Sequence, residues 1–102
     1  MLLPTNGAYL ERIRTARKTT TIRLARPRAS VGSVILFTNY RETIRTRCVS
    51  VDSTLVRLLT EQHALDDGFD SLDDLHAALR THYPALRADT AVFVIRFELL
   101  AT

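Results

Sequence analysis

One short segment of the sequence contains residue types that could perform nucleophilic chemistry. Lys18-Thr19-Thr20-Thr21-Ile22-Arg23 places three hydroxyl groups beside the only lysine of the chain. A hydroxyl becomes a nucleophile when a nearby base takes its proton, and a lysine desolvated beside another cation can be that base. The acidic segment Asp66-Asp67-Gly68-Phe69 supplies carboxylates that could hold the lysine or move the proton of a leaving group.

The same residues also have a purely structural interpretation. Three threonines favour a β-strand, and a lysine with an aspartate can form a surface ion pair that contributes less than about 1 kcal/mol. Composition and spacing by themselves favour this interpretation. One observation opposes the structural interpretation: apart from Lys18, every lysine or arginine position of the chain is an arginine. A position that needs a base would retain lysine, because arginine in practice cannot lose its proton.

The elements that must position these residues follow from hydrophobic spacing and from helix caps. Alternation and β-branched residues predict strands over 18–24, 33–38, 44–52 and 90–100, with a hairpin connection at 39–42. Helical spacing predicts helices over 7–16, 60–66 and 72–81, capped by Asn6, Thr60 and Ser71. Strands from both ends of the chain around a helical insertion predict an α+β fold, in which a small mixed sheet is closed or nearly closed into a β-barrel flanked by short helices. An open α+β sandwich is the alternative.

Length and composition exclude several classes of protein. With 102 residues, 46% of them hydrophobic, the chain is expected to form one globular domain over residues 1–102. The longest apolar run has five residues, 91–95, where a membrane-spanning helix needs about 20. Cys48 is the only cysteine, so no intramolecular disulfide can form, and we expect it in the core of a cytoplasmic protein. The three histidines and Cys48 lack the paired spacing of zinc sites, so we expect no metal and no cofactor.

The formal net charge of +3 conceals a segregation along the chain. Residues 1–57 carry eleven of the 14 Lys and Arg against three acids, whereas residues 58–102 carry three Arg against eight acids. The two halves could present complementary surfaces within one fold. Alternatively, the basic stretch 12–28, with Arg41, Arg45 and Arg47, could contact the phosphates of RNA.

Several short motifs, taken in order, resemble the ASCH domain family of the PUA-like superfamily. They are Ala16-Arg17-Lys18, Thr21-Ile22-Arg23, Leu59-Thr60-Glu61-Gln62-His63-Ala64 with Asp67-Gly68-Phe69, Leu75 through Tyr83-Pro84, and Val94-Ile95-Arg96-Phe97-Glu98. The resemblance runs from about residue 9 to residue 100. It implies a β-barrel fold that is associated with RNA.

Within that family, the length and the Lys-Thr-x-Thr-Ile-Arg segment look most like the small bacterial N(4)-acetylcytidine amidohydrolases. These enzymes cut the acetyl amide of the modified nucleoside to give cytidine and acetate, with a catalytic lysine, threonine and glutamate. The resemblance implies Lys18 as the base and Thr21 as the nucleophile. The glutamate falls in the loop where this chain offers Asp67, which is one methylene shorter, or its neighbour Asp66. A second departure is Ala16, where the family motif commonly has Gly.

The substrate is expected to be a modified nucleoside in a nucleoside-sized pocket, or RNA. Strand alternation places Arg23 on the same face as Thr21, and an exposed aromatic residue could stack an unpaired base. The expected substrate-binding residues are Arg23, Arg17, Thr19 and Tyr40. Because other members of the family are regarded as RNA binders, and ribonuclease activity has also been associated with it, an RNA-binding domain with or without that activity is the alternative function.

Overall fold

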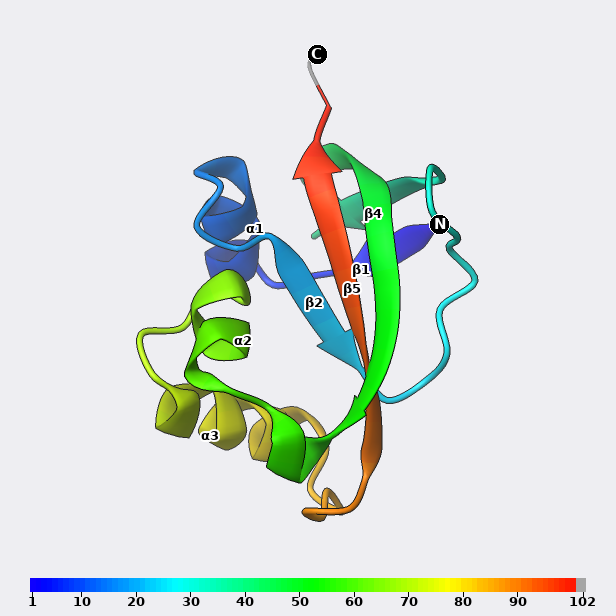
Figure 1. Cartoon of the computed structure of the whole chain (residues 1–102). Helices are drawn as coiled ribbons and strands as arrows, with labels where there is room; N and C mark the ends of the chain where they lie inside the picture. Colours follow the sequence, from blue (N-terminus) through cyan, green and yellow to red (C-terminus); the bar gives the residue numbers. More distant parts are fainter. Residues whose placement is uncertain (101–102) are drawn as a thin grey trace.

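The chain forms a curled five-stranded sheet with three short helices packed against it (Figure 1). The structure is a computed structural model that describes residues 1–100. The elements in chain order are β1 (Leu2–Pro4), α1 (Gly7–Arg14), β2 (Thr20–Arg23), β3 (Val34–Thr38), β4 (Thr43–Leu55), a 3₁₀ turn (Val56–Leu58), α2 (Glu61–Asp66), α3 (Leu72–His82) and β5 (Ala91–Leu99). The strand order is β1-β3-β4-β5-β2, parallel between β1 and β3 and antiparallel elsewhere. The α+β class and the mixed sheet are therefore confirmed, and the sheet curls into a half-barrel.

The helices begin at the capping residues that the sequence predicted. The side chain of Asn6 accepts a hydrogen bond from Tyr9 N at 2.9 Å, and that of Ser71 accepts from Asp74 N at 3.1 Å. The first helix ends at Arg14, two residues earlier than expected. It ends there because the chain turns sharply at Ala16, whose φ of 61° is left-handed.

The hairpin expected at 39–42 is confirmed, and it joins β3 to β4 with Thr38 opposite Thr43. The side chain of Asn39 accepts hydrogen bonds from the backbone N–H groups of Arg41 and Glu42, both at 2.9 Å. The tip residue Tyr40 has a φ of 70°. Strand β4 then runs for 13 residues and carries a bulge between residues 48 and 50. Such a bulge bends a strand and increases its twist, which helps the sheet to curl.

The sheet separates two apolar clusters, and alternate residues of β5 belong to each. Ile95 and Phe97 join the cluster inside the curl, which contains the buried face of α1 and Cys48. Val92 and Val94 join the cluster that covers the inner faces of α2 and α3. This alternation follows from the two-residue period of a strand. The prediction that Cys48 lies in the core is confirmed.

Two elements were missed by the sequence analysis, namely β1 and the 3₁₀ turn after β4. Strand β1 forms one edge of the sheet and β2, which contains the threonines of the Lys18 segment, forms the other. Across residues 1–100, no helix has the length and apolar character that crossing a membrane would require.

Candidate functional site

A cavity of about 570 Å³ lies between the two edge strands of the sheet. Its size is within the usual range for small-molecule pockets. Its wall is formed by the end of β1, by residues 21–23 of β2, by the β3–β4 hairpin and by one face of α3. The polar and aromatic lining residues include Asn6, Tyr9, Lys18, Thr21, Arg23, Tyr40, Asp67, Phe69, His82 and Tyr83.

A buried ion pair between Lys18 and Asp67 forms one part of this wall. Lys18 Nζ lies 2.9 Å from Asp67 Oδ1, and only 5% and 6% of the two side chains are exposed. Thr20 Oγ1 donates to the same carboxylate oxygen at 3.0 Å. The other oxygen, Oδ2, accepts no hydrogen bond among the described residues, and Asp67 is one of the residues that line the cavity. The surface ion pair of the structural interpretation is therefore wrong for this location.

The backbone places the two charged residues opposite each other. Lys18 and Asp67 form an isolated antiparallel bridge, in which Thr19 N donates to Asp66 O at 2.7 Å. The chain then turns at Gly68, with a φ of 87°. A Cβ at residue 68 would lie 3.1 Å from Lys18 Cβ, so glycine permits both the left-handed turn and the close approach.

Burial shifts both members of the pair toward their neutral forms. Desolvation lowers the pKa of the Lys18 ammonium, although Asp67 partly opposes this change, and the neighbouring cations Arg23 and Arg12 add to it. Desolvation likewise raises the pKa of the Asp67 carboxyl, against the opposing effect of Lys18 and of the Thr20 hydroxyl. A lysine in such a site gives up its proton more readily than an exposed one.

Thr21 and Arg23 face the cavity from β2. Arg23 Nε donates a hydrogen bond to Thr21 Oγ1 at 2.9 Å, and both residues line the cavity, as the alternation along the strand predicted. Within residues 1–100, no hydrogen bond joins Lys18 to Thr21. The hydroxyl that bonds to the ion pair is that of Thr20, which strand parity alone would direct to the opposite face of the sheet.

An aromatic wall stands beside the ion pair, and sequence analysis did not anticipate it. Tyr9 and Phe69 meet edge to face, with ring centroids 6.0 Å apart, and the Arg12 guanidinium lies 5.5 Å from each centroid. The Tyr9 hydroxyl is 3.3 Å from His82 Nε2, and Lys18 Nζ is 5.4 Å from the centre of the Tyr9 ring. Arg12 Nη1 is buried and has no hydrogen-bond partner among the described residues.

Three further residues expected at the site have different surroundings. Tyr40 lines the mouth of the cavity, where 77% of it is exposed. Arg17 lies on the surface and pairs with Asp70, and Thr19 Oγ1 donates to Asp66 O at 3.3 Å. Neither Arg17 nor Thr19 contributes to the cavity lining.

The two adjacent aspartates have different partners. Asp66 Oδ2 accepts from Arg96 Nη2 at 2.8 Å, and Asp66 Oδ1 accepts from Gln62 Nε2 at 2.8 Å. Asp66 therefore fastens α2 to β5, while Asp67 alone of the two lines the cavity. Although Asp67 is shorter than a glutamate by one methylene, it reaches Lys18 because the backbones of the two residues are already bridged.

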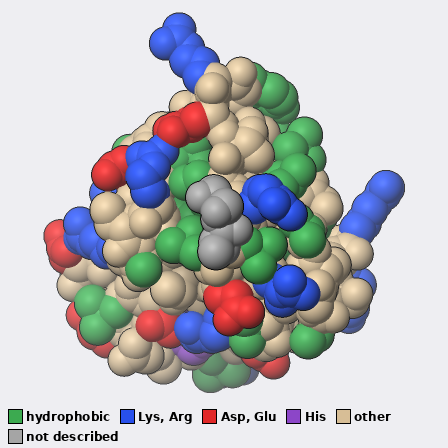
Figure 2. Space-filling view, turned by 90° about the horizontal axis from the view of Figure 1, so that it is seen from above, with side chains coloured by type: hydrophobic (Ala, Val, Ile, Leu, Met, Phe, Trp, Pro, Cys, Tyr) green, Lys and Arg blue, Asp and Glu red, His purple; other side chains and the backbone are tan. Residues whose placement is uncertain are grey.

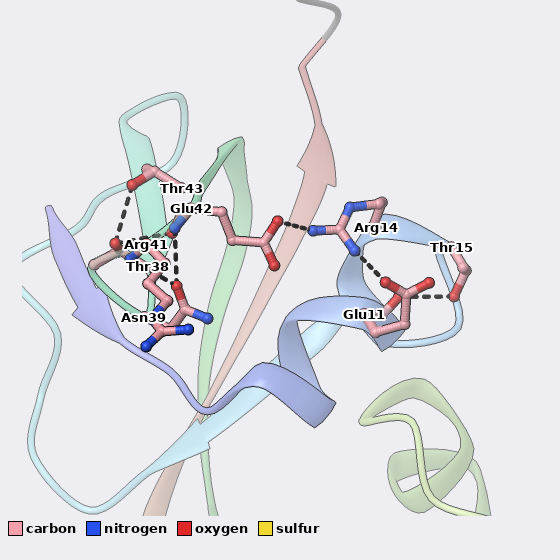
Figure 3. A network of polar contacts seen from close by, with 8 residues as sticks. All are labelled: Glu11, Arg14, Thr15, Thr38, Asn39, Arg41, Glu42 and Thr43. Atoms are coloured by element: carbon pink, nitrogen blue, oxygen red, sulfur yellow. Dashed lines mark hydrogen bonds and ion pairs between the residues drawn. The ribbon is translucent and has the colours of Figure 1, made fainter.

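A polar network holds the hairpin against α1 (Figure 3). Arg14 pairs with Glu11 on its own helix and with Glu42 in the hairpin just before β4. Thr38 Oγ1 accepts from Tyr40 N at 2.9 Å and donates to Glu42 O at 3.0 Å. These contacts hold in place the hairpin that carries Tyr40.

Within residues 1–100, the possible metal ligands His, Cys, Asp and Glu do not form any cluster of three or more that could hold a metal ion.

Comparison with solved structures identifies the fold. An ASCH domain from Lactobacillus crispatus JV V101 superposes with a TM-score of 0.78 at 18% identity, over 90% of this chain and 70% of that one. The chain has the fold of an ASCH domain. The hypothetical protein PH0355 matches with a TM-score of 0.77 at 16% identity, over 97% of both chains. Protein PF0455 from Pyrococcus furiosus matches with a TM-score of 0.69 at 20% identity, over 99% of this chain and 97% of that one. No family model and no curated protein matches the sequence.

In this ASCH fold, the cavity occupies the gap that the half-barrel leaves open. Because β1 and β2 are the two edges of the sheet, residues from the beginning of the chain and from the Lys18 segment meet across the gap. The helical insertion between β4 and β5 supplies Asp67, Phe69 and the α3 wall. The expected small mixed β-barrel flanked by short helices is thus confirmed, with the barrel open as a half-barrel.

Proposed function

We propose that the protein hydrolyses the acetyl amide of N(4)-acetylcytidine to cytidine and acetate. The observation that carries this proposal is the buried Lys18–Asp67 pair, which opens on the same cavity as Thr21 and Arg23. A structural ion pair does not need a cavity, a free carboxylate oxygen and a neighbouring hydroxyl. We also propose a cytoplasmic location for the reaction.

The reaction would proceed in two steps at one hydroxyl. In the first, Thr21 Oγ1 forms a bond to the acetyl carbon while its proton passes to the neutral Lys18 amine. The tetrahedral intermediate collapses by breaking the bond to N4, which takes up one proton, so that cytidine leaves. In the second, water attacks the acetyl-threonine ester, acetate departs, and Thr21 regains its proton.

Other residues would support these two steps. The Arg23 guanidinium, which already donates to Thr21 Oγ1, would stabilise negative charge that develops on oxygen. Asp67 would hold the lysine and take part in delivering the proton to N4. Because no hydrogen bond joins Lys18 to Thr21, the first proton transfer needs a change of the Lys18 rotamer or one intervening water, as in many enzymes without substrate.

Direct product analysis tests the proposal. Purified protein is incubated with N(4)-acetylcytidine, and cytidine is followed by chromatography. We expect cytidine from the wild-type chain and none above background from Lys18→Ala. If the wild-type protein forms no more cytidine than Lys18→Ala, the proposed activity is wrong.

A second candidate function, RNA binding, is favoured by a specific surface observation. Arg41, Arg45 and Arg47, on the hairpin and on β4, are exposed and form no ion pair within residues 1–100. Figure 2 looks down on the end of the molecule where β5 finishes, and it shows Lys and Arg side chains projecting into solvent around this face. Each phosphate neutralised on a single strand would add about 0.7 to the slope of log affinity against log salt.

Salt titration tests the second function independently of the first. A labelled single-stranded RNA should bind more weakly as salt rises, and replacing the three arginines by alanine should reduce the slope by about 2. Binding that is absent at low salt, or unaffected by the triple replacement, would count against this function. Cleavage of the labelled strand would indicate the ribonuclease variant of it.

A further inference from the structure

The free edge of β2 presents unpaired backbone groups to the cavity. Phe97 N on β5 donates to Thr19 O at 3.0 Å, and the register places Thr21 opposite Ile95. In an antiparallel pair the backbone groups of alternate residues face the partner. Thr21 and Arg23 therefore bond to β5, whereas the N–H and C=O of Ile22 point away from it. Ile22 is buried at 6% exposure and lines the cavity, and we infer that these two groups, on the free edge of β2, are within reach of a ligand bound there.

The stretch of free edge is too short for a peptide strand. At its beginning, the segment of Asp66 and Asp67 already bridges to Lys18 and Thr19. Strand β2 itself ends at Arg23. Of the two β2 residues whose backbone groups point away from β5, Thr20 and Ile22, only Ile22 lines the cavity, whose walls are partly aromatic. Its backbone therefore offers one donor and one acceptor side by side.

We propose that the backbone of Ile22 reads the pairing edge of a cytosine ring in this cavity. Its N–H donates to the ring nitrogen N3, and its C=O accepts from the N–H on N4. The aromatic side chains Tyr9 and Phe69 stand beside the site, as expected for a planar ligand. The choice of cytosine rests on the proposed function, whereas the pattern of one donor beside one acceptor comes from the strand register alone.

This arrangement has a consequence for recognition. Replacing N3 by C–H leaves the Ile22 N–H without an acceptor, and a buried donor without a partner weakens binding. Removing the hydrogen on N4 leaves the C=O without a donor in the same way. We therefore expect 3-deazacytidine and N(4),N(4)-dimethylcytidine each to bind at least about fivefold more weakly than cytidine.

The test combines these ligands with a variant of the strand. Ile22→Pro removes the N–H, and a proline is tolerated on an edge strand when its nitrogen faces away from the sheet. Ile22→Val is the matched control, since it shortens the side chain but keeps the N–H. Affinities for cytidine and 3-deazacytidine are measured by titration calorimetry, and folding of each variant is checked by circular dichroism.

The wild-type chain and Ile22→Val should distinguish the two ligands, whereas Ile22→Pro should bind both with the same affinity. Equal affinities in the wild-type chain, or no detectable cytidine binding, would overturn the inference, and this comparison decides even if Ile22→Pro does not fold. The outcome is separable from that of the proposed function. If the protein prefers cytidine to 3-deazacytidine but does not hydrolyse N(4)-acetylcytidine, base recognition by Ile22 stands and the proposed hydrolase activity is refuted. If it hydrolyses N(4)-acetylcytidine but binds both nucleosides equally, the hydrolase activity stands and base recognition by Ile22 is refuted.

Discussion

Removing one member of the Lys18–Asp67 pair should destabilise the protein strongly. Lys18→Met fills similar space but leaves the Asp67 carboxylate uncompensated in a site where it is 6% exposed. Breaking a buried pair in this way costs about 3–5 kcal/mol. A domain of this size is stable by about 5–15 kcal/mol, so the variant loses a large share of its stability. Asp67→Asn should cost a similar amount by leaving the ammonium unpaired.

The two single variants should respond to pH in opposite directions. In Lys18→Met, burial raises the pKa of the Asp67 carboxyl above its unfolded value. The loss of stability is therefore small at low pH and grows as the pH rises through the folded pKa. In Asp67→Asn, burial lowers the pKa of Lys18 below its unfolded value. That loss is smallest at high pH and grows as the pH falls through the folded pKa.

Urea unfolding followed by circular dichroism at pH 5, 7 and 9 measures these effects. The wild type, both single variants and the double variant Lys18→Met/Asp67→Asn form a complete cycle. We expect the double variant to cost less than the two single variants together and to lack their pH trends. Single losses below about 1 kcal/mol without pH dependence would refute the reasoning, since that is the behaviour of an exposed pair.

Three further predictions concern the same region. Ala16→Gly should raise stability by about 1 kcal/mol, or Tm by about 4–8 °C in thermal unfolding, because alanine is strained at a φ of 61°; an unchanged or lower Tm would contradict this. Asp67→Glu should lower the free energy of unfolding by about 1–3 kcal/mol, because the aspartate already reaches Lys18 at 2.9 Å and a further methylene overfills the site; a variant as stable as the wild type in urea would show that the site has room. The rate of cytidine release should rise with pH as Lys18 loses its proton. Because the Arg12 charge lowers the pKa of Lys18, Arg12→Met should move this rise to higher pH. A rate that falls with pH would exclude a lysine base.

The architecture could be predicted from the sequence wherever a local signal existed. Caps at Asn6, Thr60 and Ser71 mark the three helix starts, and their side chains accept the expected backbone hydrogen bonds. By contrast, β1 has only three residues and pairs with a strand more than 30 positions away. A segment that short has no period to detect, and its pairing depends on the rest of the fold.

Only part of the cavity lining could be predicted from the sequence, because Arg17 and Thr19 were expected there and do not line it, whereas Tyr9 and Phe69 do and were not expected. The lysine, threonine and arginine of the Lys18 segment could be singled out by residue type and by family resemblance. Which aspartate meets Lys18 depends on a backbone bridge after α2, and two adjacent residues of the same type cannot be separated by spacing. The bond between Thr20 and Asp67 and the position of Arg12 between two rings likewise arise from tertiary packing.

Comparing two threonines of one strand segment tests the central claim most directly. Cytidine release from N(4)-acetylcytidine is measured for Thr21→Val and for the matched control Thr19→Val, whose hydroxyl lies outside the cavity. If Thr21 is the nucleophile, Thr21→Val forms cytidine no faster than the uncatalysed reaction, while Thr19→Val keeps nearly the wild-type rate. A Thr21→Val protein that releases cytidine at the wild-type rate would contradict the proposed mechanism.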